Sequence, residues 1–168
     1  MAMDGEHLLR EVGERMRIPL KLDPKTCRCV VKNRTSREEY LIEFPPKNPF
    51  LYIYTVLRPL DNEDDGPFLR KLLTLNLFGL QTDGCTIGVD DGSRNIILHL
   101  AFPIEFVSVQ IFVNLLTNFI ETAKKMRAGL DDIRVIATRE LKKKQTHYSP
   151  AECMDKEKPK NNMRIIRI

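Results

Sequence analysis

Apolar residues recur at spacings that change several times along this chain, and each change predicts a new element. The first stripe repeats every three or four positions, as one face of a helix does, and consists of Leu8, Leu9, Val12 and Met16. Asp4 precedes this stripe as a candidate N-cap, and Pro19 follows it as a helix breaker. A first helix is therefore expected between these two residues.

After the first helix the pattern changes to alternation with a period of two, which is typical of strands that are buried on one face. Two such strands are predicted over residues 27–32 and 40–44. A third run, residues 50–57, is apolar on both faces, as expected of a central strand. Polar residues or prolines separate the runs, so the three strands are expected to form an antiparallel meander.

Residues 72–92 are the most informative part of the chain, because so many apolar side chains occupy a short helix and a hairpin. Asp64 or Asp65 can cap the helix, and Gly79 is expected to end it. The hairpin is marked by turns at Asp83-Gly84 and Asp91-Gly92, with a short strand expected between these turns and a second strand on residues 95–102. Such an apolar segment indicates a surface for protein contact.

A long helix is predicted from Phe106 to Met126, where apolar residues again recur at threes and fours. Gly129 is expected to end it. A further amphipathic helix is then indicated by Leu130, Ile133, Ala137 and Leu141. Residues 145–168 are polar, contain two prolines and are expected to be mobile.

The predicted fold class is α+β, with a single antiparallel sheet, packed helices and the order α-β-β-β-α-β-β-α followed by a C-terminal extension. A chain of 168 residues is long enough for one domain with its own core. The expected division is a domain over residues 1–129 and a basic extension over residues 130–168, partly helical and then flexible.

Charge is distributed unevenly along the chain. The net charge of +4 is confined to residues 130–168, whereas residues 1–129 are balanced. A neutral body lacks the basic face of a nucleic-acid-binding domain, so nucleic acid is not an expected partner. No basic and apolar leader opens the chain and no run approaches about 20 apolar residues, so we expect a cytoplasmic protein without membrane insertion.

Residues suited to catalysis or metal binding do not form a recognised set. Cys27 and Cys29 lie on one face of a predicted strand without a second ligand pair, and reduced cysteines are expected. His99 has no nucleophile motif near it in the sequence. The glycines of residues 79–92 follow neither phosphate-loop pattern. We therefore predict a protein that is not an enzyme and uses no catalytic residues, metal or cofactor.

The order of elements and several phrases resemble the CesT (Tir chaperone) family of bacterial type III secretion chaperones. The phrases are Leu8-Leu9-Arg10-Glu11-Val12-Gly13, Ile18-Pro19-Leu20, Leu51-Tyr52-Ile53-Tyr54, Leu73-Thr74-Leu75-Asn76-Leu77-Phe78-Gly79, Thr82-Asp83-Gly84, Thr86-Ile87-Gly88-Val89-Asp90 and Asn118-Phe119-Ile120-Glu121-Thr122-Ala123. The resemblance covers about residues 4–127. It departs from the family in the charge, which is usually acidic, and in the long extension.

The resemblance implies a homodimer that binds N-terminal segments of secreted effector proteins and keeps them secretion-competent, with the secretion ATPase as a further partner. It places the dimer interface at Leu69, Leu72, Leu73, Leu75, Asn76, Phe78, Ile87 and Val89. It places effector binding at Leu8, Val12, Met16, Ile18, Val30 and Leu41. No cofactor is implied.

Two alternatives remain open at this point. A regulatory or adaptor protein of the same fold would bind a folded partner instead of an extended effector segment. A nucleic-acid-binding protein would act through the basic tail, and its affinity would fall steeply with salt. The sequence does not identify the effectors, their number or the role of residues 130–168.

Overall fold

A computed structural model describes residues 5–33, 37–61 and 66–146, the last six of these by their backbone alone. In order along the chain, the elements are α1 (Gly5–Met16), β1 (Arg28–Lys32), β2 (Glu39–Glu43), β3 (Phe50–Pro59), α2 (Gly66–Leu75), η1 (Leu77–Gly79), β4 (Thr86–Asp90), β5 (Asn95–Pro103), η2 (Ile104–Phe106) and α3 (Val109–Thr146). This order confirms the predicted α+β class. The caps expected at Asp4 and at Asp64 or Asp65 and the behaviour expected of residues 147–168 lie outside the described residues.

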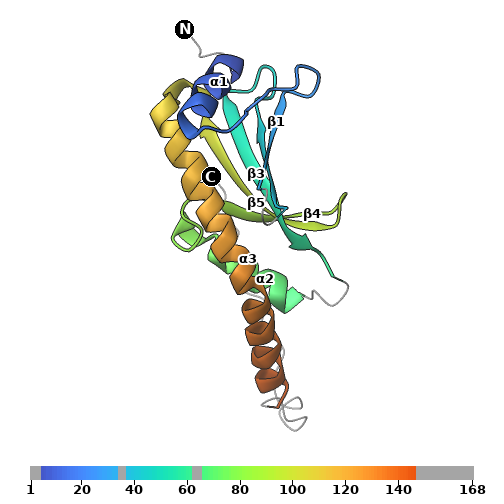
Figure 1. The fold of residues 1–168 in the computed structure, drawn as a ribbon. Coiled ribbons are helices and arrows are strands. Elements are labelled where there is room, and N and C mark those ends of the chain that lie inside the picture. The colour runs from blue at the N-terminus through green and yellow to red at the C-terminus, as the bar shows by residue number, and fades with distance from the viewer. Residues whose placement is uncertain (1–4, 34–36, 62–65, 147–168) are drawn as a thin grey trace, which may run out of the picture.

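The five strands form one antiparallel sheet in the order β1-β2-β3-β5-β4 (Figure 1). The first three strands are the predicted meander, and β3 is central, as its two apolar faces indicated. β1 and β4 form the two edges.

The helices α1 and α3 cover one face of this sheet (Figure 1). Alternate residues of each strand point toward them and are buried, as a period of two requires. The buried set from the sheet and the helices includes Leu8, Leu9, Val12, Tyr40, Ile42, Leu51, Ile53, Ile96, Leu98, Phe112, Leu116 and Phe119. None of the helices in the described residues lies over the other face (Figure 1), and its apolar side chains, such as Val30 and Val56, are exposed.

Helix α3 does not end at Gly129, which corrects the prediction of two separate helices. It continues without interruption to Thr146. A glycine inside a helix costs about 1 kcal/mol relative to alanine, and local packing offsets that cost here. Leu130 and Ala137 are buried as part of the core, and Arg134 Nη1 lies 3.2 Å from Asp61 Oδ2. The division between a domain over residues 1–129 and an extension stays a prediction.

Arg127 connects α3 to the sheet through hydrogen bonds and an ion pair. Its guanidinium donates to Glu38 Oε1 at 2.8 Å, to Thr55 Oγ1 at 2.6 Å and to the Val56 carbonyl at 2.8 Å. It also lies over the Tyr40 ring, 5.6 Å from its centre. Because both charged side chains of the Arg127–Glu38 pair are mostly buried, this contact is stronger than a surface ion pair.

Candidate protein-binding surfaces

An exposed apolar surface covers the last turn of α2 and the residues that follow it. It consists of Leu73, Leu77, Phe78 and Leu80, which are 65%, 63%, 85% and 79% exposed, and we call it the η1 surface. Single exposed apolar residues are ordinary, whereas four within eight positions form a patch of the kind that marks an interaction site.

The backbone of the η1 surface is strained at its most exposed residue. Phe78 has a φ of +58°, a left-handed conformation that is unfavourable for any residue with a Cβ. The next residue, Gly79, has a φ of +67°, and a Cβ there would lie 3.0 Å from the Gly84 Cα. The Gly84 amide donates to the Gly79 carbonyl at 3.0 Å, so this close approach holds the turn. The turn presents Phe78 outward at a cost in backbone strain.

The β4 edge of the sheet is occupied by side chains from its own chain. The Asn76 amide donates to the Ile87 carbonyl at 2.9 Å and accepts from the Ile87 amide at 2.8 Å. Thr82 and Cys85 are also joined by two hydrogen bonds. The Cys85 amide donates to the Thr82 carbonyl, and the Thr82 hydroxyl donates to the Cys85 carbonyl. Another strand therefore cannot pair with β4 at Cys85 or Ile87 without displacing these contacts.

The β1 edge is open at its centre. The Asn33 amide donates to Glu38 and the Phe44 amide donates to Cys27, so by alternation the Val30 main chain faces away from β2. Asp23 covers only the beginning of this edge, where its amide donates to the Arg28 carbonyl at 2.8 Å. Among the residues that the structure describes, none bonds to the Val30 main chain on that side.

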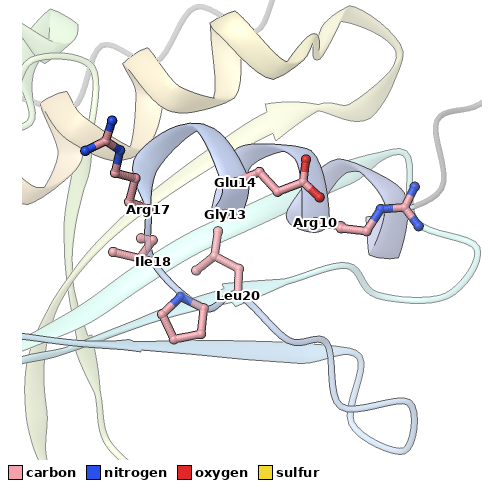
Figure 2. Close-up of a pocket in the computed structure, with 7 residues that line it drawn as sticks. Arg10, Gly13, Glu14, Arg17, Ile18 and Leu20 are labelled. Carbon is pink, nitrogen blue, oxygen red and sulfur yellow. The ribbon is translucent and has the colours of Figure 1, made fainter.

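A groove runs along α1, between the helix and the chain segment that follows it (Figure 2). It consists of a hollow of about 320 Å³ and a second of about 450 Å³, which share Arg10 and Leu20. One end of the groove lies at the C-terminal end of α1, where the Ile18 amide donates to the Gly13 carbonyl at 3.0 Å. This approach requires glycine, since a Cβ on Gly13 would lie 2.8 Å from the Ile18 carbonyl oxygen.

The structure separates the residues expected at a dimer interface into three groups. Leu72 and Ile87 are buried within the chain, so their side chains are unavailable on its surface. Leu69, Leu75 and Asn76 are partly buried, and Asn76 is engaged with β4. The exposed members are Leu73, Phe78 and Val89.

Sequence reasoning missed Leu77 and Leu80 as members of the η1 surface. They lie beyond the end of α2, where no helical period identifies a face. The signal in the sequence that could have identified this surface was the presence of four apolar residues close to Gly79.

The residues expected to bind effectors are divided in a similar way. Leu8 and Val12 are buried under the sheet and belong to the core. Met16, Ile18 and Leu41 are partly exposed, and Val30 is exposed. Val30 and Leu41 lie opposite each other on the open face of the sheet. A helical apolar stripe does not distinguish a core face from a binding patch, so Leu8 and Val12 were assigned to a surface that they do not reach.

The reactive side chains have environments typical of structural positions. Burial raises the pKa of the Cys85 thiol to about 11 and also raises that of Cys29, so both thiols stay protonated near neutral pH. Burial lowers the pKa of His99 on the open sheet face. Within residues 5–33, 37–61 and 66–140, no three metal-ligating side chains converge. No helix in the described part of the chain combines the length and apolar character needed to cross a membrane.

These features define a class of protein: a small α+β chain whose prominent sites are surfaces for other polypeptides. Residues 7–127 match the Tir chaperone protein (CesT) family. Because this match covers most of the chain, the protein belongs to that family. A search of curated proteins finds no match.

Solved structures share the fold. The HopA1–SchA chaperone–effector complex contains a chain with 20% identity and a TM-score of 0.60, and the match covers 72% of this protein and 91% of that chain. A chain of the ExsC–ExsE complex has 17% identity and a TM-score of 0.62 over 76% of this protein and 97% of that chain. A chain of the heterodimeric ExoU–SpcU complex from the type III secretion system of Pseudomonas aeruginosa has 13% identity and a TM-score of 0.53, with 77% and 97% covered.

Proposed function

We propose that this protein is a homodimeric type III secretion chaperone that binds N-terminal segments of effector proteins in the bacterial cytoplasm. The family match supports the class, and similar folds occur in chaperone–effector complexes. The observation in the structure that carries the proposal is the open β1 edge beside an uncovered sheet face. Binding requires only non-covalent contact, so the protein acts without a cofactor or covalent chemistry. It delivers its cargo to the secretion ATPase.

An extended effector segment can add to the sheet at Val30. Its main chain would hydrogen-bond to the free β1 edge, which gives affinity that does not depend on sequence. Its alternate side chains would lie on the two faces of the sheet: one set beside Val30, which pairs with Leu41 on the open face, and the other set on the face covered by α1, where Met16 and Ile18 lie at the end of the helix. These four residues are the part of the predicted effector site that a partner can reach.

The η1 surface is the proposed dimer interface. Leu73, Leu77, Phe78 and Leu80 are exposed in the single chain, and we place the partly buried Leu69 and Leu75 and the exposed Val89 at the margin of the interface. A second copy would cover them through the same patch on both chains, as two-fold symmetry requires. A stable interface of standard size covers about 800 Å² on each partner, so the exposed apolar side chains form its centre and not its whole area.

Leu73→Asp or Phe78→Asp tests the dimer. Either change places a charge in the interface and should produce monomers or aggregates, which light scattering can distinguish. Phe106→Asp is the matched control, because Phe106 is 63% exposed, close to the 65% of Leu73, but lies in η2, before the start of α3. An unchanged dimer in the Phe78 variant would refute this interface.

Val30→Pro tests the cargo edge. Proline removes an amide that points away from β2, so the sheet is expected to remain folded while strand addition is blocked. Val30→Thr is the control, since it keeps the amide.

Co-purification from the native bacterium should identify an effector whose N-terminal segment resists protease only in the complex. Capture of folded partners alone, without a protected segment, would instead support the regulatory alternative.

A further inference from the structure

The last part of α3 lies outside the family domain. The family match ends at residue 127, whereas α3 continues to Thr146. Figure 1 shows this part of the helix passing α2 and extending away from the sheet. We call residues 128–140, whose side chains the structure describes, the α3 arm. Since the family match does not include the arm, its role has to be inferred from its own contacts.

The α3 arm is held in place by the rest of the chain. Leu130 and Ala137 are buried. Glu140 forms an ion pair with Lys71 of α2, with 3.4 Å between the carboxylate oxygen and the ammonium nitrogen. A helix that is already fixed in the free chain loses little conformational freedom when a partner binds to it. The arm is therefore a preformed surface.

Ile136 lies at the boundary between the α3 arm and α2. Successive residues of an α-helix are about 100° apart around its axis, so Glu140 lies between the buried Ala137 and Ile136, about 40° from Ile136. Val135 is about 140° from Glu140, on the side of the arm away from α2. Ile136 and Val135 are 43% and 47% exposed. The arm thus exposes two similar apolar residues, of which only Ile136 lies beside α2.

The exposed side of α2 joins Ile136 to the η1 surface. Phe68 and Leu72 face the core, and Lys71 reaches the α3 arm. The exposed residues on the opposite side of α2 are Arg70, Leu73 and Thr74. Leu73 is also the first member of the η1 surface. A second copy that covers Leu73 and the exposed side of α2 would therefore also meet the arm at Ile136.

The η1 surface alone is smaller than a stable dimer needs. An interface of standard size involves about 20–30 residues and about 800 Å² on each partner. The four residues of the η1 surface supply an apolar centre, so further contacts have to come from the surface next to it. The exposed side of α2 and the α3 arm are continuous with the η1 surface and can supply such contacts.

We propose that the α3 arm is part of the dimer interface and that Ile136 packs against the second copy. This inference rests on the proposed homodimer and extends its interface beyond the family domain. By two-fold symmetry, each copy contributes its own arm and receives the arm of the other.

The test compares Ile136→Asp with Val135→Asp in the full-length chain. Sedimentation velocity over a dilution series gives the dimer Kd of each variant. Ile136→Asp should raise Kd at least about ten-fold, because it places an unpaired carboxylate in the interface. Both residues are exposed in the single chain, so both variants should fold, which circular dichroism checks.

Val135→Asp is the matched control. It introduces the same charge and the same helix propensity at the neighbouring position, on the other side of the arm, so Kd should change less than about two-fold. An unchanged Kd in Ile136→Asp would overturn the role of the arm. An equal rise in Val135→Asp would do the same, because the effect would then come from charge or from the helix itself.

Photo-crosslinking tests the same contact without a change in charge. Ile136→p-benzoylphenylalanine should link two copies on irradiation, which gives a product of twice the mass of the chain on a denaturing gel. Val135→p-benzoylphenylalanine should give little of this product, and equal yields from the two variants would contradict the assignment.

The role of the α3 arm and the dimer itself can fail separately. If Phe78→Asp produces monomers while Ile136→Asp leaves Kd unchanged, the dimer stands and the arm has no part in it. A wild-type chain that stays monomeric at every concentration would refute the proposed dimer, and the role of the arm with it.

Discussion

Asn76 stabilises the fold by closing the β4 edge, and Asn76→Ala measures how much. The side chain makes two hydrogen bonds, donating to the Ile87 carbonyl at 2.9 Å and accepting from the Ile87 amide at 2.8 Å. Ile87 is buried, so its main-chain groups have poor access to water once Asn76 is removed. A buried group left without its partner costs about 1–3 kcal/mol, and the two together should lower the free energy of unfolding by about 2–4 kcal/mol.

Asn76→Asp separates the two bonds. The carboxylate can still accept from the Ile87 amide, but it has no donor for the Ile87 carbonyl. Because its second oxygen would also repel the Ile87 carbonyl, this variant should lose at least as much free energy of unfolding as the alanine variant, about 2–4 kcal/mol. Asn118→Ala, on the exposed side of α3, is the control and should change the free energy of unfolding by less than about 0.5 kcal/mol.

Urea unfolding followed by circular dichroism gives these free energies. Each variant needs two protein concentrations, so that dissociation of a dimer is distinguished from unfolding of the chain. If the free energy of unfolding of Asn76→Ala lies within about 0.5 kcal/mol of the wild-type value, water replaces the contacts at the β4 edge and the stabilising role of Asn76 is refuted.

Three further outcomes follow from the packing of α3 and the sheet. Arg127→Met keeps the apolar stem but removes the cation that pairs with the mostly buried Glu38, and urea unfolding should show a loss of about 2–4 kcal/mol; a double-mutant cycle with Glu38→Gln should show strong coupling. Gly129→Ala should raise the thermal midpoint, with a gain of about 0.5–1 kcal/mol, because a Cβ there meets no atom within 4 Å. Burial lowers the pKa of His99 from its usual 6.5, so the unfolded chain binds the proton more tightly. Stability should fall as the pH drops from about 7 through 6.5, and His99→Gln should flatten that part of the profile.

The order of elements could be predicted from the sequence because each one has a clear period. Cys29 and Val31 share a face, as do Tyr40 and Ile42, and the structure pairs these residues across β1 and β2. The continuation of α3 past Gly129 could not be predicted in this way, since the glycine argues for an end and the packing of Leu130 that overrides it is a tertiary effect.

The candidate surfaces were harder to predict than the elements. Leu8 and Leu73 are both apolar residues at helical spacing, yet one is buried in the core and the other is 65% exposed. Periodicity shows that a face is apolar but not what covers it. The roles of Asn76 and Thr82 at the β4 edge were also invisible, because each depends on a side chain that meets a strand several residues away.

The difference between the two sheet edges limits how copies of this chain can associate. If β1 and β4 were both open, the β1 edge of one copy could pair with the β4 edge of the next, and such a head-to-tail contact has no natural end. Asn76 and Thr82 occupy the main-chain groups of Ile87 and Cys85, so this route is blocked at those two positions, and the β1 edge at Val30 remains for a strand from another protein. The proposed dimer forms through side chains of the η1 surface, and three of its four residues, Leu77, Phe78 and Leu80, lie between Asn76 and Thr82 in the sequence. The residues that close one edge thus also hold the segment that presents Phe78, so Asn76→Ala should weaken dimerisation as well as folding.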